Sequence, residues 1–120
     1  MTIEALYRQL LPFREQIGDV LVASPTKLSS SRLFVLSALF VLEGGANNEI
    51  RDAAANVPHD LADPELSRLR HKKRIGEVMR PLRRLGLITH TDHGVHQQYT
   101  YHLAPRTRRC LENCLAHIAA

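Results

Sequence analysis

The sequence contains no tryptophan, and aromatic residues make up only 5% of its 120 residues. A hydrophobic core must therefore be built mainly from aliphatic side chains, and the hydrophobic content of 44% is enough for one domain of this length. The longest apolar run, residues 33–42, is broken by Ser37 and is much shorter than the roughly 20 residues that span a bilayer. Residues 1–11 contain Glu4 and Arg8 and lack the apolar stretch of a signal peptide. We expect a single-domain cytoplasmic protein without a membrane partner.

Cysteine is also scarce. The two cysteines, Cys110 and Cys114, lie four residues apart in a predicted helix, where a disulfide would strain the backbone. We expect both thiols to be reduced and to pack in the core or at an interface. His117 shares their helix face, but a fourth metal ligand would have to come from elsewhere. Three further histidines, His90, His93 and His96, recur at intervals of three without a nearby acid or thiolate. The sequence therefore predicts no metal and no cofactor.

Motifs that carry enzyme chemistry are missing from the sequence. It contains no nucleophile elbow, no paired-carboxylate motif and no zinc-peptidase helix. Gly44 and Gly45 are not followed by the Lys-Ser or Lys-Thr pair of a phosphate-binding loop. We do not expect this chain to be an enzyme.

The charges that are present are segregated along the chain. The net formal charge is +4, but residues 65–109 contain eleven Lys or Arg against three Asp or Glu, a local charge of +8. The remaining residues carry a charge of −4. Clustered positive charge is typical of a protein that binds a polyanion. The alternative is a basic face that contacts only solvent.

The first half of the sequence predicts helices. Apolar residues follow a helical spacing in residues 2–22, and Pro12 within them predicts a kink or two shorter helices. After the serines at 29–31, a helix that is apolar on nearly all sides should be buried. Gly44 and Gly45 are expected to end it. Asn47 or Asn48 would then cap a short helix over residues 49–56.

Residues 64–85 predict two helices separated by a break. Leu66 and Leu69 lie on the opposite side of a helical wheel from the apolar stripe that begins at Ile75, so one straight helix cannot point both sets at one core. A break near residues 70–73 resolves this conflict and leaves a helix over residues 71–85, in which Pro81 predicts a kink. The basic residues opposite the apolar stripe of this helix are Lys72, Lys73, Arg80, Arg83 and Arg84.

The last third of the sequence predicts a hairpin and a helix. Residues 87–91 and 96–103 are rich in β-forming residues and flank the turn-forming residues 92–94. Tyr99, Tyr101 and Leu103 alternate onto one face of the second strand. Pro105 then opens a final helix. The expected fold class is mostly α with a small β-hairpin.

The second half of the sequence contains the stretches VMRPLRRLGLITHT (residues 78–91) and QQYTYHLAPRTRRCLENCL (residues 97–115). They resemble the end of the recognition helix and the wing of MarR-like and PadR-like transcription regulators. Residues 82–88 match the Leu-x-x-x-Gly-Leu-Ile junction of these families, and residues 101–103 match their Tyr-x-Leu strand. The resemblance covers residues 30–118 and implies a winged helix-turn-helix with extra N- and C-terminal helices. Residues 2–22 would form a helical extension, 30–103 the winged-helix core and 105–118 the C-terminal helix. Thr107 stands where these families usually carry glycine.

The resemblance implies that the partner is double-stranded DNA, read by the basic helix and the wing. The residues that would face DNA are Lys72, Lys73, Arg80, Arg83, Arg84, His93 and His96. Lys72 and Lys73 are the most informative of these, because positive charge at a helix N-terminus is mildly unfavourable and needs another explanation. For Arg83 and Arg84, a solvated helix end is the alternative.

We further expect a homodimer that regulates transcription, because one module rarely provides enough affinity for a specific site. The dimer contact would come from the N-terminal or the C-terminal helix. Its residues would be Leu6, Leu10, Phe13, Ile17, Leu111, Cys114, Leu115 and Ile118. Alternatively, both helices pack on their own domain. Two other functions stay open: a DNA-targeting accessory of a nuclease, phage or plasmid system, and a winged-helix protein–protein adaptor.

Overall fold

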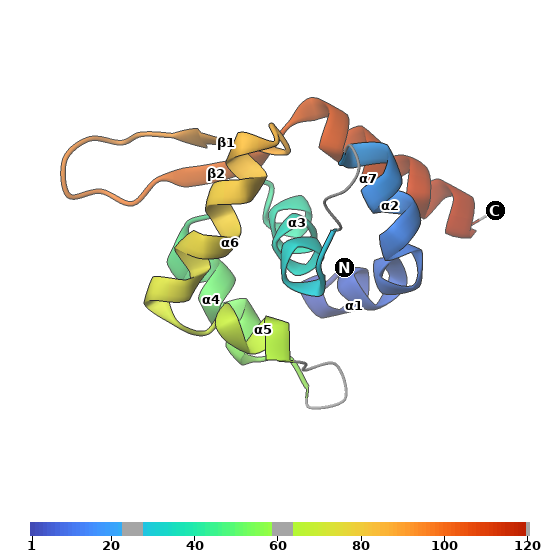
Figure 1. Cartoon of the computed structure of the whole chain (residues 1–120), viewed down its shortest axis with the longest axis horizontal. Helices are drawn as coiled ribbons and strands as arrows, with labels where there is room; N and C mark the ends of the chain where they lie inside the picture. Colours follow the sequence, from blue (N-terminus) through green and yellow to red (C-terminus); the bar gives the residue numbers. More distant parts are fainter. Residues whose placement is uncertain (23–27, 59–63, 120) are drawn as a thin grey trace.

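The computed structural model describes residues 1–22, 28–58 and 64–119. The chain begins with α1 (Ile3–Leu10), the 3-10 turn η1 (Leu11–Phe13) and α2 (Arg14–Leu21). It continues with α3 (Ser30–Leu42), α4 (Asn47–Ala55), α5 (Pro64–Arg68) and α6 (Lys72–Arg84). The hairpin strands β1 (Ile88–Thr91) and β2 (Thr100–Leu103) precede α7 (Pro105–Ala119) (Figure 1). The prediction of helices with a small antiparallel hairpin is confirmed.

Two predicted helix breaks are confirmed. Pro12 lies in η1, where the chain passes from α1 to α2, because proline has no N–H to continue the helical hydrogen bonds. The second break separates α5 from α6, and it allows Leu66, Leu69 and Ile75 all to be buried in one core. Pro81 lies inside α6, and the helix continues past it to Arg84.

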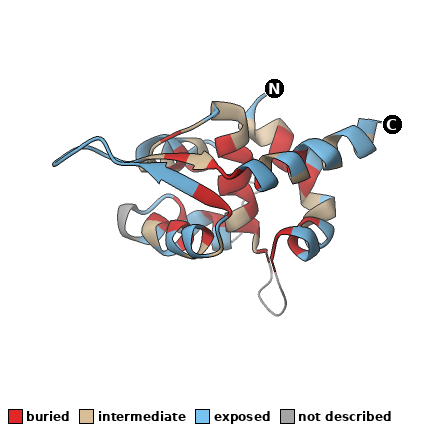
Figure 2. Cartoon of the chain, turned by 90° about the horizontal axis from the view of Figure 1, so that it is seen from above, coloured by how far each residue is buried: buried red, intermediate tan, exposed pale blue. Residues whose placement is uncertain are grey.

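Helix α3 forms the centre of the molecule. All residues from Leu33 to Leu39 are buried, and Ser37 donates its hydroxyl hydrogen bond to the Leu33 carbonyl, 2.9 Å away. Helices α1, α4, α5 and α6 and strand β2 all contact α3. Figure 2 shows this central position, with α3 buried and the far end of the hairpin exposed. The all-round apolar pattern of α3 is therefore satisfied by neighbours on every side.

The end of α3 differs from the prediction that the glycine pair terminates it. The left-handed residue at the C-terminus is Glu43, with φ of 55°. Gly44 has φ of 125°, and a Cβ there would lie 2.6 Å from the His102 ring. Gly45 forms an isolated antiparallel bridge with Tyr101, with N–O distances of 3.0 and 2.8 Å. Gly44 is thus required by its positive φ and its contact with the distant strand β2, whereas a Cβ at Gly45 would lie 3.0 Å from the Leu42 side chain.

The cap of α4 also differs from the prediction. The N-cap residue is Ala46, and Asn47 is already helical. The Glu49 carboxylate accepts a hydrogen bond from the Ala46 N–H at 3.1 Å, and the Glu49 N–H donates to the Asn48 side chain at 2.9 Å. Because the Asn48 side chain already accepts from the Glu49 N–H, the group that an N-cap side chain usually pairs with, an asparagine is not needed at position 46.

The paired strands of the hairpin are shorter than predicted, and the loop that joins them is longer. Its register pairs Ile88 with Leu103 and Thr91 with Thr100, so the expected strand over residues 96–99 is wrong. Val95 is 83% exposed, and His96 has a positive φ of 68°. Residues 91–99 are all exposed, and the loop over residues 92–99 projects from the body (Figure 1). We call this segment the wing loop.

Candidate nucleic-acid interface

Helix α6 separates apolar from basic side chains. Ile75, Val78, Met79 and Leu82 are buried in the core. Arg80, Arg83 and Arg84 are exposed, as expected from the helical wheel. Within the described residues, Arg80 and Arg84 form no ion pair or hydrogen bond. Their guanidinium groups are therefore available to an external anion.

Further charged residues belong to α6 or come just before it in the chain. Arg70 and Arg74, which precede α6 or lie in its first turn, are exposed as well. Glu77 is an exposed carboxylate on the same helix. Lys72 and Lys73 belong to the first turn of α6, but their side chains lie outside the described part of the structure.

A cluster of aromatic rings joins α6 to the hairpin. The Arg83 Nη2 atom lies 3.4 Å from His90 Nε2, and its guanidinium carbon lies 5.8 Å from the centroid of the Tyr99 ring. The His90 and Tyr99 rings are 4.7 Å apart, and Tyr99 meets Tyr101 edge to face at 6.2 Å. Burial raises the pKa of Tyr101, partly offset by Arg83, so its hydroxyl stays neutral. The cluster fixes the hairpin base against α6.

The wing loop exposes polar groups. His93 Nε2 lies 2.7 Å from the Thr100 hydroxyl, and the Gly94 N–H donates to the Asp92 carboxylate at 2.9 Å. His93 and His96 are both exposed. The wing loop contains neither lysine nor arginine. The positive charge of this surface therefore comes from α6 rather than from the hairpin tip.

Arg106 belongs to the basic segment of the sequence but has a structural contact. Its two terminal nitrogens donate hydrogen bonds to the carbonyl oxygens of Leu21, at 3.2 Å, and Leu85, at 2.8 Å. These carbonyls lie at the C-terminal ends of α2 and α6, where backbone acceptors lack helical partners. The sequence shows the charge of Arg106 but does not predict these contacts.

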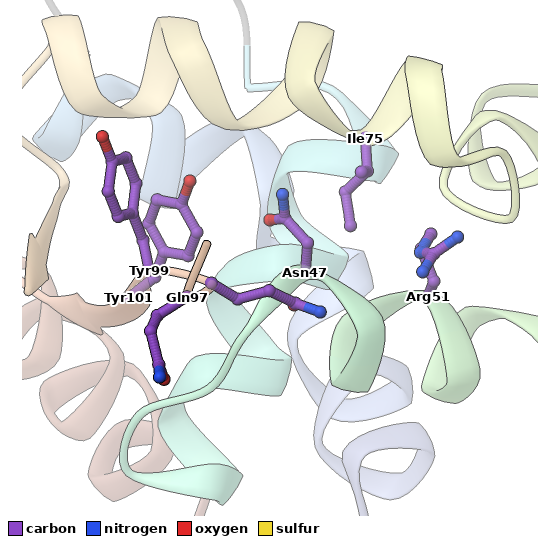
Figure 3. Close-up of a pocket in the computed structure, with 7 residues that line it drawn as sticks. Asn47, Arg51, Ile75, Gln97, Tyr99 and Tyr101 are labelled. Carbon is purple, nitrogen blue, oxygen red and sulfur yellow. The ribbon is translucent and has the colours of Figure 1, made fainter. Parts of the chain in front are cut away.

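A pocket of about 410 Å³ lies between α4, α6 and the end of the wing loop. Figure 3 shows Asn47 rising from α4, Ile75 descending from α6, and the Tyr99 and Tyr101 rings side by side at one end. Gln97, Gln98 and Arg51 complete the lining. The sequence does not predict this pocket, because its walls come from three separate parts of the chain.

The residues predicted for dimerisation divide into two groups. Leu6, Leu10, Ile17 and Leu111 are buried in the core of their own chain and are not available to a second copy. The half-exposed members are Phe13, Cys114, Leu115 and Ile118. Phe13 and Cys114 line a groove of about 380 Å³ between α2 and α7.

The two cysteines and the one histidine of α7 lie in the same groove. Cys110, Cys114 and His117 all line it. Burial raises the pKa of both thiols, and the proximity of Cys114 adds to the effect at Cys110. Among the described residues, no three His, Cys, Asp or Glu side chains are grouped so that they could hold a metal ion.

Comparison with known proteins does not assign this chain. It matches no protein-family model, no curated protein and no solved structure. Over the described ranges, every helix is too short or too polar to cross a membrane. The function must be argued from the surface formed by α6 and the hairpin.

Proposed function

We propose that this chain is a winged-helix protein that binds double-stranded DNA, with α6 as the recognition helix and the hairpin as the wing. The observation that supports it most is a pair of exposed arginines, Arg80 and Arg84, on the helix beside the hairpin, which have no ion-pair or hydrogen-bond partner among the described residues. A B-DNA major groove admits one α-helix, and arginine both neutralises phosphates and recognises guanine.

The arrangement of elements supports the winged-helix assignment. Helices α3, α4 and α6 precede the hairpin, and α4 and α6 contact each other. Besides its pairing with β1, strand β2 forms a single bridge from Tyr101 to Gly45, which lies between the end of α3 and the start of α4. Such a bridge ties the wing to the helices and limits its position relative to α6.

The proposed role is the regulation of transcription by a homodimer of this chain. A cytoplasmic homodimer that binds two half-sites would gain affinity and sequence specificity over a single module. The half-exposed apolar residues along α2 and α7 are the surface from which such a dimer could be built. Lys72 and Lys73 stay among the residues proposed to contact DNA, together with His93 and His96 of the wing loop.

Neutralising the α6 arginines tests the proposal. The double variant Arg80→Gln and Arg84→Gln should weaken binding to a fluorescein-labelled duplex, measured by fluorescence anisotropy at low salt. Each lost phosphate contact should also reduce the salt slope of log K by about 0.9. The single variants Arg80→Gln and Arg84→Gln are each compared with Arg109→Gln, which removes the same single charge from an exposed arginine on α7. Equal binding by the double variant and the wild type would overturn the assignment of α6.

A further inference from the structure

The pocket between α4, α6 and the wing loop contains polar atoms without partners. Asn47 Oδ1 and Arg51 Nε are buried, and in the described part of the chain neither has a hydrogen-bond partner. Buried polar atoms are nearly always paired in folded proteins. A ligand that provides a donor near Asn47 and an acceptor near Arg51 would therefore relieve an unfavourable state of the free protein.

The walls of the pocket have the chemistry of a site for a planar ring. Tyr99 and Tyr101 provide aromatic surface, and Ile75 provides an apolar contact from α6 (Figure 3). Tyr99 is 37% exposed yet held in place by His90, whose ring centroid lies 4.7 Å away, and by Arg83. Rings that are already oriented lose little freedom when a second ring stacks on them.

The remaining wall is made of amides. Gln97, Gln98 and Asn47 each carry one acceptor oxygen and an NH₂ donor. Nucleobases present mixed donors and acceptors at their edges, which amide side chains can pair with. The volume of about 410 Å³ exceeds the roughly 150 Å³ that accommodates a single benzene ring, so a base and its sugar have room.

From this combination we propose that the pocket binds a nucleobase carried by a nucleotide, with the base against Tyr99 and the phosphate toward Arg51. A guanidinium group is suited to phosphate because it offers several donors in one plane. The same chemistry can come from a free nucleotide or from an unpaired nucleotide in a nucleic-acid strand. The inference does not require the proposed binding of fully paired DNA.

Calorimetric titration tests the first source. AMP, GMP, CMP and dTMP are each titrated into the intact chain, with ribose 5-phosphate as the control for charge alone. We expect saturable binding of at least one nucleotide at one site per chain, and none of ribose 5-phosphate. Arg51→Met and Asn47→Leu should each weaken that binding about tenfold, since each removes a polar contact while keeping most of the side-chain volume. Arg109→Met, with an exposed arginine on α7, should bind as the wild type does.

A second arm tests the nucleic-acid source. Affinity is compared between a duplex with one unpaired nucleotide and the same duplex with an abasic residue at that position. A preference for the unpaired base that disappears in Tyr99→Ala would assign the pocket to nucleic acid, whether or not free nucleotides bind. Absence of nucleotide binding at millimolar concentration together with no preference between the two duplexes would overturn the proposal. So would binding that none of the pocket variants alters. Because the first arm contains no DNA and the second measures a difference, neither depends on α6 binding paired DNA.

Discussion

At the scale of single residues, Arg106 and Thr107 join the start of α7 to the rest of the fold. Arg106 holds the ends of α2 and α6, and the buried Thr107 hydroxyl donates to the Leu87 carbonyl at 2.8 Å. The Ala104 N–H donates to the same carbonyl at 3.0 Å. The position after the wing, where the resembling families usually carry glycine, is thus occupied by a side chain with a specific hydrogen bond.

Thr107→Val should destabilise the fold by about 1 kcal/mol, because it removes one buried hydrogen bond while nearly preserving the shape of the side chain. The Ala104 N–H still pairs with the Leu87 carbonyl, so the loss should not exceed one ordinary hydrogen bond. Thr107→Ser keeps the hydroxyl and is the matched control. Urea denaturation followed by circular dichroism measures both, and a valine variant at least as stable as the serine variant would contradict this role.

The thiols of α7 give a pH-dependent prediction. Burial raises the pKa of Cys110 and Cys114, and the thiolate is the form that reacts with alkylating reagents. Alkylation of the folded chain by iodoacetamide should therefore reach its half-maximal rate at a higher pH than alkylation of the unfolded chain. The stability due to these neutral thiols is present below the pKa of the unfolded thiols and is lost as the pH rises through the folded pKa. Equal midpoints for the folded and unfolded chains would refute the effect of burial.

At the scale of elements, the hairpin consists of a short paired base and a long polar loop. Pairing stops at Thr91 and Thr100, while the aromatic cluster around Tyr99 holds the base against α6. The exposed wing loop contributes little to the core. Its role in the proposed complex is polar contact without fixed positive charge, since it lacks lysine and arginine.

Replacing residues 92–99 with Asn-Gly should leave the fold intact, because a two-residue type I′ turn can close a hairpin between directly paired residues. Duplex affinity should fall through the loss of His93 and His96 and of the Tyr99 ring, which contacts Arg83 and His90 at the hairpin base. Because the wing loop contains neither lysine nor arginine, the slope of log K against log salt should change by less than about 0.9, the value for one phosphate contact. Thermal denaturation verifies the fold, and anisotropy measures the slope. Unchanged affinity would remove the wing loop from the DNA interface.

The elements also show how far the sequence alone could predict the structure. Local signals in the sequence predicted the break at Pro12, because proline limits the backbone. They also predicted the break between α5 and α6, because Leu66 and Ile75 cannot face one core from a single straight helix. They failed where contacts across the fold decide. Gly44 lies against the His102 ring, and the second strand begins only at Thr100, although pairing was expected from residue 96.

The same distinction applies to the candidate site. The exposure of Arg80, Arg83 and Arg84 could be predicted, because amphipathic spacing determines which side of a helix faces the core. The cluster of Arg83, His90 and Tyr99 could not, because its members come from α6, β1 and the wing loop. Nor does the sequence indicate that Arg106 is bound to two backbone carbonyls rather than to an external anion.

At the scale of the whole molecule, the fold separates a structural half from a projecting half. Helices α1, α2 and α7 lie together on one side of α3, with α4, α6 and the hairpin on the other (Figure 1). The hairpin extends the molecule along its longest dimension of 45 Å. The basic segment of the sequence contributes α6, whose exposed arginines lie next to the hairpin. The proposed function assigns duplex DNA to this half.

The most direct test is fluorescence anisotropy of the wild-type chain with a labelled duplex of random sequence, repeated over a series of salt concentrations. Phosphate contacts release counterions, each contributing about −0.9 to the slope of log K against log salt. If α6 contacts the phosphate backbone through several of its arginines, the duplex should bind at low salt with a slope of roughly −3 or steeper. No binding at low salt, or binding with a slope near zero, would contradict the proposal that this basic helix is a DNA-binding surface.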